Sequence, residues 1–534
     1  MAENPNVECS SWQVSREEWM WALKWMAVLL AVVLLPYLLA YAAARPDERF
    51  TGVLGQDIDT NTYLTKIRLG LEGHWGYVDR YTSEPHGPMP FYLPIVWWGL
   101  VTRPVTRDPA ISYRLSQGVC CVGALAASYS FVAALYSNRV QRRIAFLLIA
   151  LGAGIGWMTL PLVLVGRQSL AAVDMWMQEA TLFAAMLSMP HFAAAVALLL
   201  VAMRAFLLQT RAWSSTRAVV LVVASAVMIL IHPFLALQVV VVASVYLVVQ
   251  RVRGRPWRIL LPAWLLLHLG VGLAYLTIQA GLRFSLLGRH LVVAQLSPPP
   301  YAYALGYGAL LVLALFGGVL SVKRRLDPLP VIWFFAGVPL LYSPVAVQRR
   351  LLEGLAIPIC VLAAAMLHQV VLPWLSHRAR LVRSGLWIGL AITIVGSNVV
   401  LWSIACVNAL SHQEPWFVSE DEAAMWNWLL ENGEPDEIVL SSSRLGNRIP
   451  AHTNKRVVVG HWAETVDYAG KNAAVEQFFD PATADAEREA TLVRFGAAYV
   501  VQGPDECTAD LEALPGLQQV YVNGRFTVFR YTEE

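Results

Sequence analysis

The sequence predicts a polytopic α-helical membrane protein with a small soluble α/β domain at its C-terminal end. Of the 534 residues, 57% are hydrophobic and only 14% are charged, and the mean hydropathy is +0.52. Soluble globular chains carry roughly 25% charged residues, so this much apolar surface indicates a membrane rather than one soluble core. Charge divides the chain: residues 409–534 hold 9 Lys and Arg against 21 Asp and Glu, a net of −12, and the rest carries +15. We therefore predict a membrane domain, 1–408, and a soluble domain, 409–534.

Apolar runs of about 20 residues, enough to cross roughly 30 Å of hydrocarbon, mark the predicted spans. The first run has Arg16 and Lys24 at its start and lacks a small-residue cleavage site at a convincing distance. We expect a retained span there rather than a removed signal peptide. The runs lie at 22–44, 113–136, 144–165, 180–206, 259–280, 304–322, 329–345, 353–373 and 385–408.

The apolar stretch 218–250 predicts a hairpin of two short helices rather than one span. A single helix of that length would be ~50 Å long. Arginines flank both ends, which places both ends on the cytoplasmic side. His232-Pro233 lies at its middle, where proline breaks a helix. The hairpin raises the count to about eleven transmembrane helices.

The distribution of basic residues sets the orientation of these spans. With a cytoplasmic N-terminus, the cytoplasmic loops contain fifteen Lys and Arg and the short outside loops contain five, as expected for cytoplasmic loops. Residues 45–112 and 409–534 then lie outside. The short span 329–345 is decisive, because its loss would reverse everything after it. Membrane topology explains these basic clusters, so we expect no nucleic-acid partner.

The long first outside segment, 45–112, predicts a short amphipathic helix. Lys66 and Arg68 occupy other faces than its apolar stripe, so we expect the helix to lie along the membrane surface. Asp59 or Thr60 suits its N-cap. The stripe consists of Tyr63, Ile67 and Leu71, spaced four residues apart.

The C-terminal segment predicts a small domain of alternating strands and helices. Ser419 and Glu422 form a capping box at the start of a helix, and Asn523-Gly524 is a hairpin turn signal. Neither a glycine-rich phosphate loop nor a nucleophile elbow occurs in it, so the sequence alone shows no chemistry there. Strands are expected at 437–441, 455–460, 497–502, 517–522 and 525–531, and further helices at 463–479 and 483–494.

Acidic residues outside the membrane are the first candidates for chemistry. Asp57 and Asp59 form an Asp-x-Asp, which suits a general base or a divalent cation site; the alternative is a helix cap in a solvated loop. Glu84 and His86, flanked by aromatic residues, allow the same two interpretations. A further acidic pair in the second outside loop, Asp174 and Glu179, is more often plain loop charge.

Arg349 and Arg350 form a basic pair in a short outside loop, against the charge rule. Adjacent guanidinium groups at the headgroup level suit a phosphate ester, or they snorkel to the interface. His191 and His232 are ionisable residues beside prolines in apolar runs. Such residues suggest function, although a neutral histidine that binds a carbonyl freed at the kink is an equal interpretation.

These features resemble the class C (GT-C) superfamily of lipid-dependent glycosyltransferases, in the branch of the protein O-mannosyltransferases and bacterial aminoarabinose transferases. The family has an acidic residue and then a tyrosine just after span one, as in Asp59-Thr-Asn-Thr-Tyr63, which GLEGHW and YTSEPH follow. Gln348-Arg349-Arg350 before EGLAIP resembles its basic segment before a late span, and the soluble outside tail is also similar. Ile58 separates two aspartates where many members have adjacent Asp-Glu, which leaves the base open between Asp57 and Asp59.

The resemblance implies a hexosyl- or pentosyltransferase of the cell envelope, at the outer face of the plasma (cytoplasmic) membrane. It would take a polyprenyl-phosphate-linked sugar as donor and a lipid, glycan or protein as acceptor, with membrane lipids around it. Asp59 or Asp57 would be catalytic, the two together suit a divalent cation, and arginines would stabilise the leaving phosphate. A transporter or flippase, or a non-catalytic assembly protein, are the alternatives. The expected substrate-binding residues are Tyr63, Glu84, His86, Asp174, Glu179, His191, His232, Gln348, Arg349 and Arg350.

Overall fold

The computed structural model of the chain describes residues 14–167, 170–284, 294–506 and 510–532. It divides into two compact units. The helical unit consists mainly of residues 14–35, 117–276 and 294–406, and the composite unit mainly of 36–116 and 407–532. The units therefore do not follow a linear boundary at residue 408: the first predicted outside segment forms one unit with the C-terminal segment.

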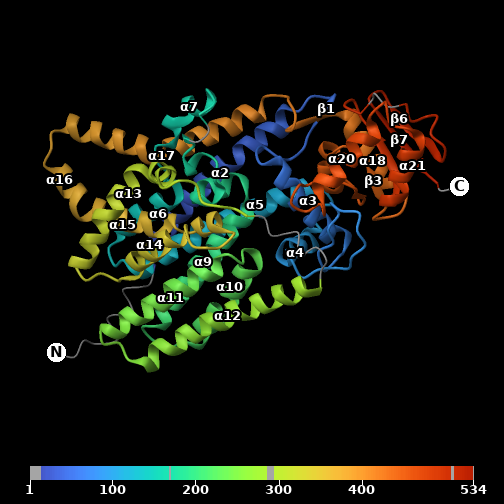
Figure 1. The fold of residues 1–534 in the computed structure, drawn as a ribbon. Coiled ribbons are helices and arrows are strands. Elements are labelled where there is room, and N and C mark those ends of the chain that lie inside the picture. Colours follow the sequence, from blue (N-terminus) through green and yellow to red (C-terminus); the bar gives the residue numbers. More distant parts are fainter. Residues whose placement is uncertain (1–13, 168–169, 285–293, 507–509, 533–534) are drawn as a thin grey trace. The chain divides into compact units, whose positions relative to one another are not determined.

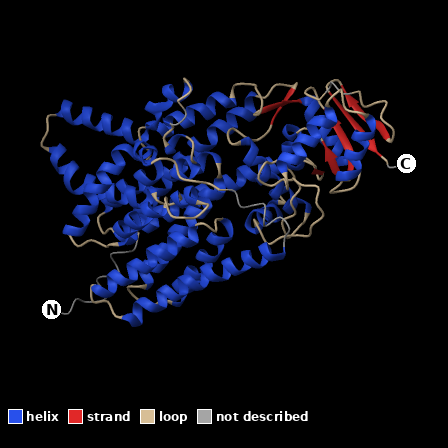
Figure 2. Cartoon of the chain, in the orientation of Figure 1, coloured by secondary structure: helices blue, strands red, loops and turns tan. Residues whose placement is uncertain are grey.

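The helical segments identify a multi-pass membrane protein (Figures 1 and 2). Within the described residues, nine helical segments are long and apolar enough to cross a membrane, and α10 (Ser215–Ile231) and α14 (Leu329–Leu340) are shorter apolar helices. An apolar helix thus lies at each of the eleven predicted spans. The nine are α2 (Arg16–Ala43), α5 (Pro109–Leu135), α6 with α7 (Arg139–Leu151, Leu160–Leu164), α9 (Pro190–Gln209), α11 (Leu235–Val252), α12 (Trp257–Phe284), α13 (Pro300–Lys323), α15 with α16 (Ala356–Met366, Leu372–Ser376) and α17 (Arg380–Ala409).

Prolines mark two positions where a helix is interrupted. The predicted hairpin at 218–250 is confirmed, because α10 ends at Ile231 and α11 begins at Leu235, with His232-Pro233 between them. The predicted continuous span at 180–206 is wrong: α8 (Leu182–Ser188) ends before Pro190, which begins α9. Proline lacks the N–H that a continuing helix needs but suits a first helical position.

The composite unit places α3 (Asp57–Glu72) in its interior. Gly70 of α3 and Gly99 of α4 (Leu93–Thr102) allow backbone contact between the two helices, since a Cβ at Gly70 would lie 1.9 Å from the Val96 carbonyl oxygen. Lys66 and Arg68 are 1% and 9% exposed, so the predicted surface helix is wrong. The missing information was tertiary: α4 and α19 (Ser443–His452) pack against α3 and cover its polar faces.

The start of α3 also differs from the prediction of a cap at Asp59 or Thr60. The helix begins earlier, at Asp57, and its N-cap is Gln56, three residues before Asp59, in the left-handed region with φ 50°. Asp59 therefore lies in the first turn, and its side chain is available for another contact. Free N–H groups in that turn favour a negative charge.

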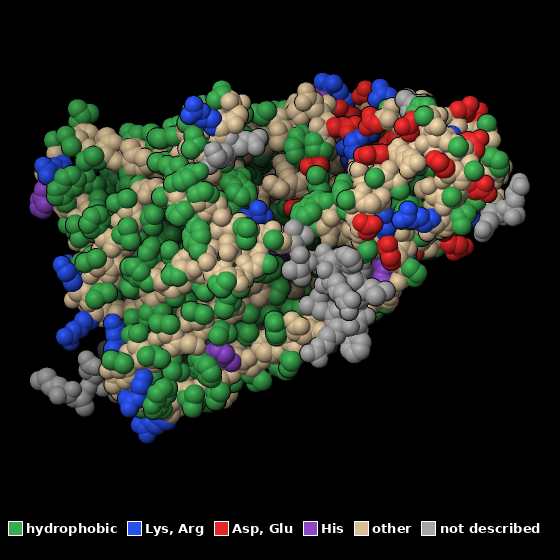
Figure 3. All heavy atoms as spheres, viewed as in Figure 1, with side chains coloured by type: hydrophobic (Ala, Val, Ile, Leu, Met, Phe, Trp, Pro, Cys, Tyr) green, Lys and Arg blue, Asp and Glu red, His purple; other side chains and the backbone are tan. Residues whose placement is uncertain are grey.

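The C-terminal segment forms a mixed five-stranded sheet of order β4-β3-β5-β7-β6. β3 runs parallel to β4 and β5, and β7 is antiparallel to β5 and β6. Helices α18 and α19 pack on one face and α20 and α21 on the other. Acidic side chains gather on its surface, whereas hydrophobic side chains dominate the surface of the membrane helices (Figure 3). The bounds are β3 Ile438–Leu440, β4 Arg456–Val457, β5 Ala497–Gln502, β6 Leu517–Asn523, β7 Phe526–Tyr531, α18 Glu420–Glu431, α20 Tyr468–Phe479 and α21 Asp485–Phe495.

The first segment and the tail are joined by backbone pairing as well as by side chains. Strand β1 (Glu48–Phe50) pairs antiparallel with β2 (Phe417–Ser419). Ser419 caps α18 by accepting the Glu422 N–H at 3.3 Å, as predicted. The Glu422 carboxylate, however, accepts from Arg448 at 3.0 Å. Glu422 therefore supports α19 through Arg448, with no reciprocal bond of a capping box recorded.

Candidate functional site

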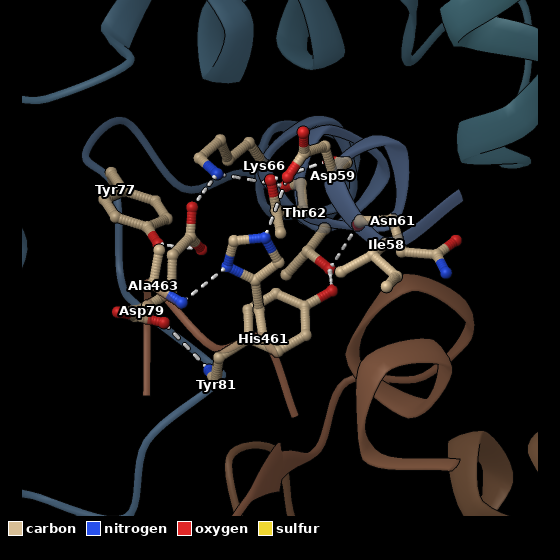
Figure 4. Close-up of polar contacts among 12 residues, drawn as sticks. Ile58, Asp59, Asn61, Thr62, Lys66, Tyr77, Asp79, Tyr81, His461 and Ala463 are labelled. Carbon is tan, nitrogen blue, oxygen red and sulfur yellow. Dashed lines mark hydrogen bonds and ion pairs between the residues drawn. The ribbon is translucent and has the colours of Figure 1, made fainter. Parts of the chain in front are cut away.

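The first turn of α3 carries the candidate catalytic carboxylate. Asp59 Oδ1 lies 3.0 Å from Nε2 of His461, which follows β4 in the tail (Figure 4). The Asp59 side chain is 44% exposed, whereas that of His461 is 6% exposed. Asp57, the other predicted candidate, is the first residue of the same helix and is half-buried. The Asp59 carboxylate is thus partly exposed while it contacts a buried histidine.

The backbone around His461 forms a tight turn. The N–H groups of Glu464 and Thr465 donate to the His461 carbonyl at 3.1 and 2.8 Å. Thr465 Oγ1 then donates to the Tyr81 carbonyl at 2.7 Å, which ties the turn to the first segment. Tyr81 is itself buried in the core of the tail domain. His461 is therefore held by hydrogen bonds from both stretches of the composite unit.

Glu464, three residues after His461, belongs to a buried ion pair. Lys66 Nζ donates to Glu464 Oε1 at 2.6 Å, and Tyr77 donates its hydroxyl to Glu464 Oε2 at 2.9 Å. Burial by itself would raise the pKa of Glu464, but Lys66, with the hydrogen bond from Tyr77, holds it below its usual value. Tyr63 and Tyr92 present their rings to Lys66 at 5.1 and 4.4 Å. Tyr63, a predicted substrate-binding residue, therefore also packs against Lys66.

Asp79 is a second buried acid in this region, and it gives a pH prediction. Burial, with Glu464 nearby, raises its pKa to about 8. The folded chain then keeps a proton that the unfolded chain loses near pH 4, so this group makes the fold less stable as pH rises from about 4 to about 8. We expect Asp79→Asn to stabilise the protein relative to wild type progressively across that window. Thermal unfolding at several pH values measures this; a constant difference would contradict it.

Glu84 and His86, two predicted substrate-binding residues, lie where the first segment meets the tail. Glu84 Oε2 accepts from Lys471 at 2.7 Å and also pairs with the Thr82 hydroxyl. Burial would raise the pKa of Glu84, but Lys471 and Thr82 lower it below its usual value. His86 Nε2 accepts the Asp79 N–H at 3.0 Å, and burial lowers the pKa of this imidazole. The Glu84 side chain therefore links the first segment to the tail, and the His86 side chain holds the backbone at Asp79.

The helical unit contains a separate polar cluster around the predicted arginine pair. Arg350 Nη1 donates to Glu179 Oε1 at 3.1 Å, and Arg349 Nε lies 3.8 Å from the same oxygen. The guanidinium carbon of Arg349 lies 5.4 Å from the centre of the Trp176 ring, and that of Arg350 lies 5.5 Å from the centre of the Phe192 ring. Glu179 is 2% exposed, against 27% and 21% for the arginines. The two arginines thus share one buried carboxylate.

The two predicted histidines join this unit's polar network. His232 Nδ1 lies 2.6 Å from Glu353 Oε2, and the His191 ring is 5.3 Å from that of His232. Glu353 is buried and was not among the predicted site residues. Glu179, Glu353 and Phe192 line one small cavity. The sequence signal for Glu353 was an acid at the start of the apolar run EGLAIP.

Two further predicted residues order loops of the helical unit. Asp174 is fully buried, and its Oδ2 accepts the Gly154 N–H at 2.9 Å. Burial raises its pKa to about 6. Gln348 accepts the Ser297 N–H at 3.1 Å and donates to the Ser343 carbonyl at 2.8 Å. Asp174 therefore holds the backbone at Gly154. Gln348, the residue before Arg349, holds the backbone at Ser297 and Ser343.

Metal ligands do not converge in the part of the chain that the structure describes. No group of three or more His, Cys, Asp and Glu side chains there is arranged to hold an ion. Asp59 instead contacts His461 of the tail. The predicted use of Asp57 and Asp59 as cation ligands would need donors from a substrate or from water, as Mg²⁺ often does.

Comparison with known proteins identifies the fold. No family model and no curated protein matches the chain. Among solved structures, the apo oligosaccharyltransferase of Archaeoglobus fulgidus matches with a TM-score of 0.55 and 13% identity, over 96% of this chain and 74% of that one. ArnT from Cupriavidus metallidurans, bound to undecaprenyl phosphate, matches with a TM-score of 0.52 and 13% identity, over 95% and 98%. The mycobacterial arabinofuranosyltransferase AftD matches with 0.51 and 13%, over 96% and 40%.

At these identities the likeness establishes the fold. The chain has the polytopic fold of the GT-C glycosyltransferases, with a soluble domain after its last membrane helix, and the predicted fold class is confirmed. The match to ArnT extends over nearly the full length of both chains. Loops and the tail domain are therefore included in the shared architecture, as well as the bundle of spans.

Proposed function

We propose that the protein is a membrane glycosyltransferase that moves a hexosyl or pentosyl group from a polyprenyl-phosphate donor to a lipid, glycan or protein acceptor. The observation that carries the proposal is the end-to-end fold match to ArnT, whose structure holds undecaprenyl phosphate. Archaeal AglB from Archaeoglobus fulgidus, in complex with an inhibitory peptide and a dolichol phosphate, has the same fold with a TM-score of 0.51. Two neighbours with a polyprenyl-type phosphate make this lipid class the best-supported donor.

The proposed reaction is an inverting displacement at the anomeric carbon. An acceptor hydroxyl oxygen forms the new bond, the bond from the anomeric carbon to the phosphate oxygen breaks, and polyprenyl phosphate leaves with the electron pair. Asp59 accepts the hydroxyl proton. Its partial exposure and its place in the first turn of α3 support this role, because the N–H groups at a helix start favour the ionised carboxylate that a general base requires.

Arg349 and Arg350 are the proposed partners of the donor phosphate. Guanidinium groups bind phosphate oxygens with charge-assisted bonds, and fixed cations stabilise the charge that develops on a leaving group. Their shared partner Glu179 holds the two guanidinium groups next to each other, where one phosphate can contact both. Trp176 and Phe192 beside the guanidinium groups hold them in place without neutralising them.

The enzyme assay that tests the proposal uses the purified chain in liposomes. Isotopically labelled sugar on a polyprenyl phosphate should pass to an acceptor, and free polyprenyl phosphate should accumulate in equal amount. A flippase would move the intact donor between leaflets without breaking that bond. Transport without release of polyprenyl phosphate would therefore replace the enzyme with the transporter alternative.

The proposed orientation puts the N-terminus in the cytoplasm and residues 45–112 and 409–534 outside the plasma membrane. The fifteen-to-five distribution of basic residues supports it. Single cysteines in the tail should react with an impermeant reagent in intact cells, and cysteines at 137–143 should react only after permeabilisation. A tail cysteine that needs permeabilisation would contradict the orientation.

A further inference from the structure

We propose that His461 is the positioning residue for Asp59: an imidazole from the tail that donates from Nε2 to Asp59 Oδ1 and holds the carboxylate in position. The inference rests on the function proposed above and adds to it a contribution from the tail domain. Sequence analysis found no chemistry in that domain, and it left the base open between Asp57 and Asp59. The contact with His461 favours Asp59.

The hydrogen-bond pattern around the ring defines its tautomer. The backbone N–H of Ala463 points to His461 Nδ1 at 3.3 Å. A backbone N–H can only donate, so Nδ1 must be the acceptor. In a neutral imidazole the hydrogen then resides on Nε2. The atom that faces Asp59 Oδ1 at 3.0 Å is therefore the donor.

This tautomer suits a positioning role and not a competing base. Nε2 already carries a hydrogen, so His461 cannot take the acceptor's proton at that atom. Its donation favours the ionised form of Asp59, because a hydrogen bond to a carboxylate stabilises the charge. It also engages only Oδ1, and the Asp59 side chain remains 44% exposed. At this exposure the carboxylate is accessible to an acceptor hydroxyl.

The ring's surroundings keep this arrangement fixed. His461 is 5% exposed, and the Tyr81 ring lies 6.2 Å from it in an edge-on orientation. Three other ionisable groups face this region. Lys66 and Glu464 form an ion pair at 2.6 Å, and burial raises the pKa of Asp79. Trp462, the next residue, is 47% exposed and stands beside the imidazole at 5.7 Å. The histidine is thus buried while its partner and its neighbour remain accessible.

The decisive experiment compares His461→Leu, His461→Gln and the control His74→Leu, with transfer from a polyprenyl-phosphate sugar measured across pH. Leucine removes the donor, whereas glutamine places an amide N–H near the position of Nε2. For His461→Leu we expect the acid limb of the pH–rate profile to move up by about one unit, and transfer near pH 6 to fall about 10-fold. His461→Gln should restore most of the profile, and the donor KM should change little. The exposed His74, in the same unit, should have no effect.

A wild-type profile for His461→Leu would overturn the proposal, as would a His461→Gln enzyme that folds normally but is as impaired as the leucine variant. If the leucine variant does not fold, ¹⁵N-histidine NMR of the wild-type chain decides. We expect a neutral Nε2–H tautomer that changes in Asp59→Asn; a hydrogen on Nδ1 would overturn the assignment. Should the wild-type chain transfer no sugar at all, the proposed function fails, and the NMR still tests the His461–Asp59 contact.

Discussion

Asp59→Asn is expected to lower sugar transfer by about 100-fold or more, the scale of a lost general base, with little change in thermal stability. The amide has nearly the shape of the carboxylate, and its oxygen can still accept the hydrogen that His461 offers at 3.0 Å. The N-cap of α3 is Gln56 and makes no side-chain cap bond, so the substitution removes no cap. Charge is then the main property that changes. Initial rates of transfer and a melting curve measure the two effects.

Asp57→Asn is the matched control for this variant, two residues away on the same helix. It should retain most of the activity if Asp59 is the base. A dead Asp57→Asn beside an active Asp59→Asn would move the role to Asp57. Full activity in both variants would remove the carboxylate mechanism altogether, while the fold would be unaffected by that result.

Replacing both Arg349 and Arg350 with glutamine is expected to weaken binding of polyprenyl phosphate about 10- to 100-fold. Charge-assisted hydrogen bonds contribute roughly 1.5–3 kcal/mol. The double variant leaves Glu179, which is 2% exposed, without its two cations. A buried charge without a partner destabilises a protein by itself, so a folding defect could imitate a binding defect.

A triple variant that adds Glu179→Gln separates the two effects. With the carboxylate neutralised, stability should recover, whereas phosphate binding should remain weak. Arg167→Gln provides a control, because Arg167 is exposed in the second predicted outside loop. Binding of labelled polyprenyl phosphate to detergent-solubilised protein is the measurement. Normal affinity in the triple variant would show that the arginines serve only the ion pair with Glu179.

The spans were predictable because membrane insertion imposes a local rule. A helix needs enough apolar residues in a row, and prolines interrupt it, so the break at His232-Pro233 was visible in the sequence. The strands of the tail sheet were also predictable, because they depend on local sequence and on turn residues. The hairpin appears as predicted, with Asn523 paired to Phe526 at the end of β6.

The candidate site depended on pairing across long distances, which no local pattern contains. Lys66 looked like a solvated residue of a surface helix, yet its partner Glu464 lies 398 positions later. The helix α19, which packs against α3 and accepts a hydrogen bond from Arg68, was not expected because Gly446 and Pro450 disfavour helix. One signal was available: polar residues directly after a parallel strand, as at His461 after β4, often form sites in α/β sheets.

Asp59 and His461 are 402 positions apart, so the ribosome synthesises them at different times. Ribosomes add about 5–20 residues per second, so roughly 20–80 s separate the emergence of the two residues. During that interval α3 has left the ribosome, with Lys66 and Arg68 uncovered, while the intervening helices enter the bilayer. The unit can close only when the last quarter of the polypeptide has been translated. A nascent chain that stops before residue 456 would therefore carry all the described membrane helices and still lack the residue that positions its proposed base.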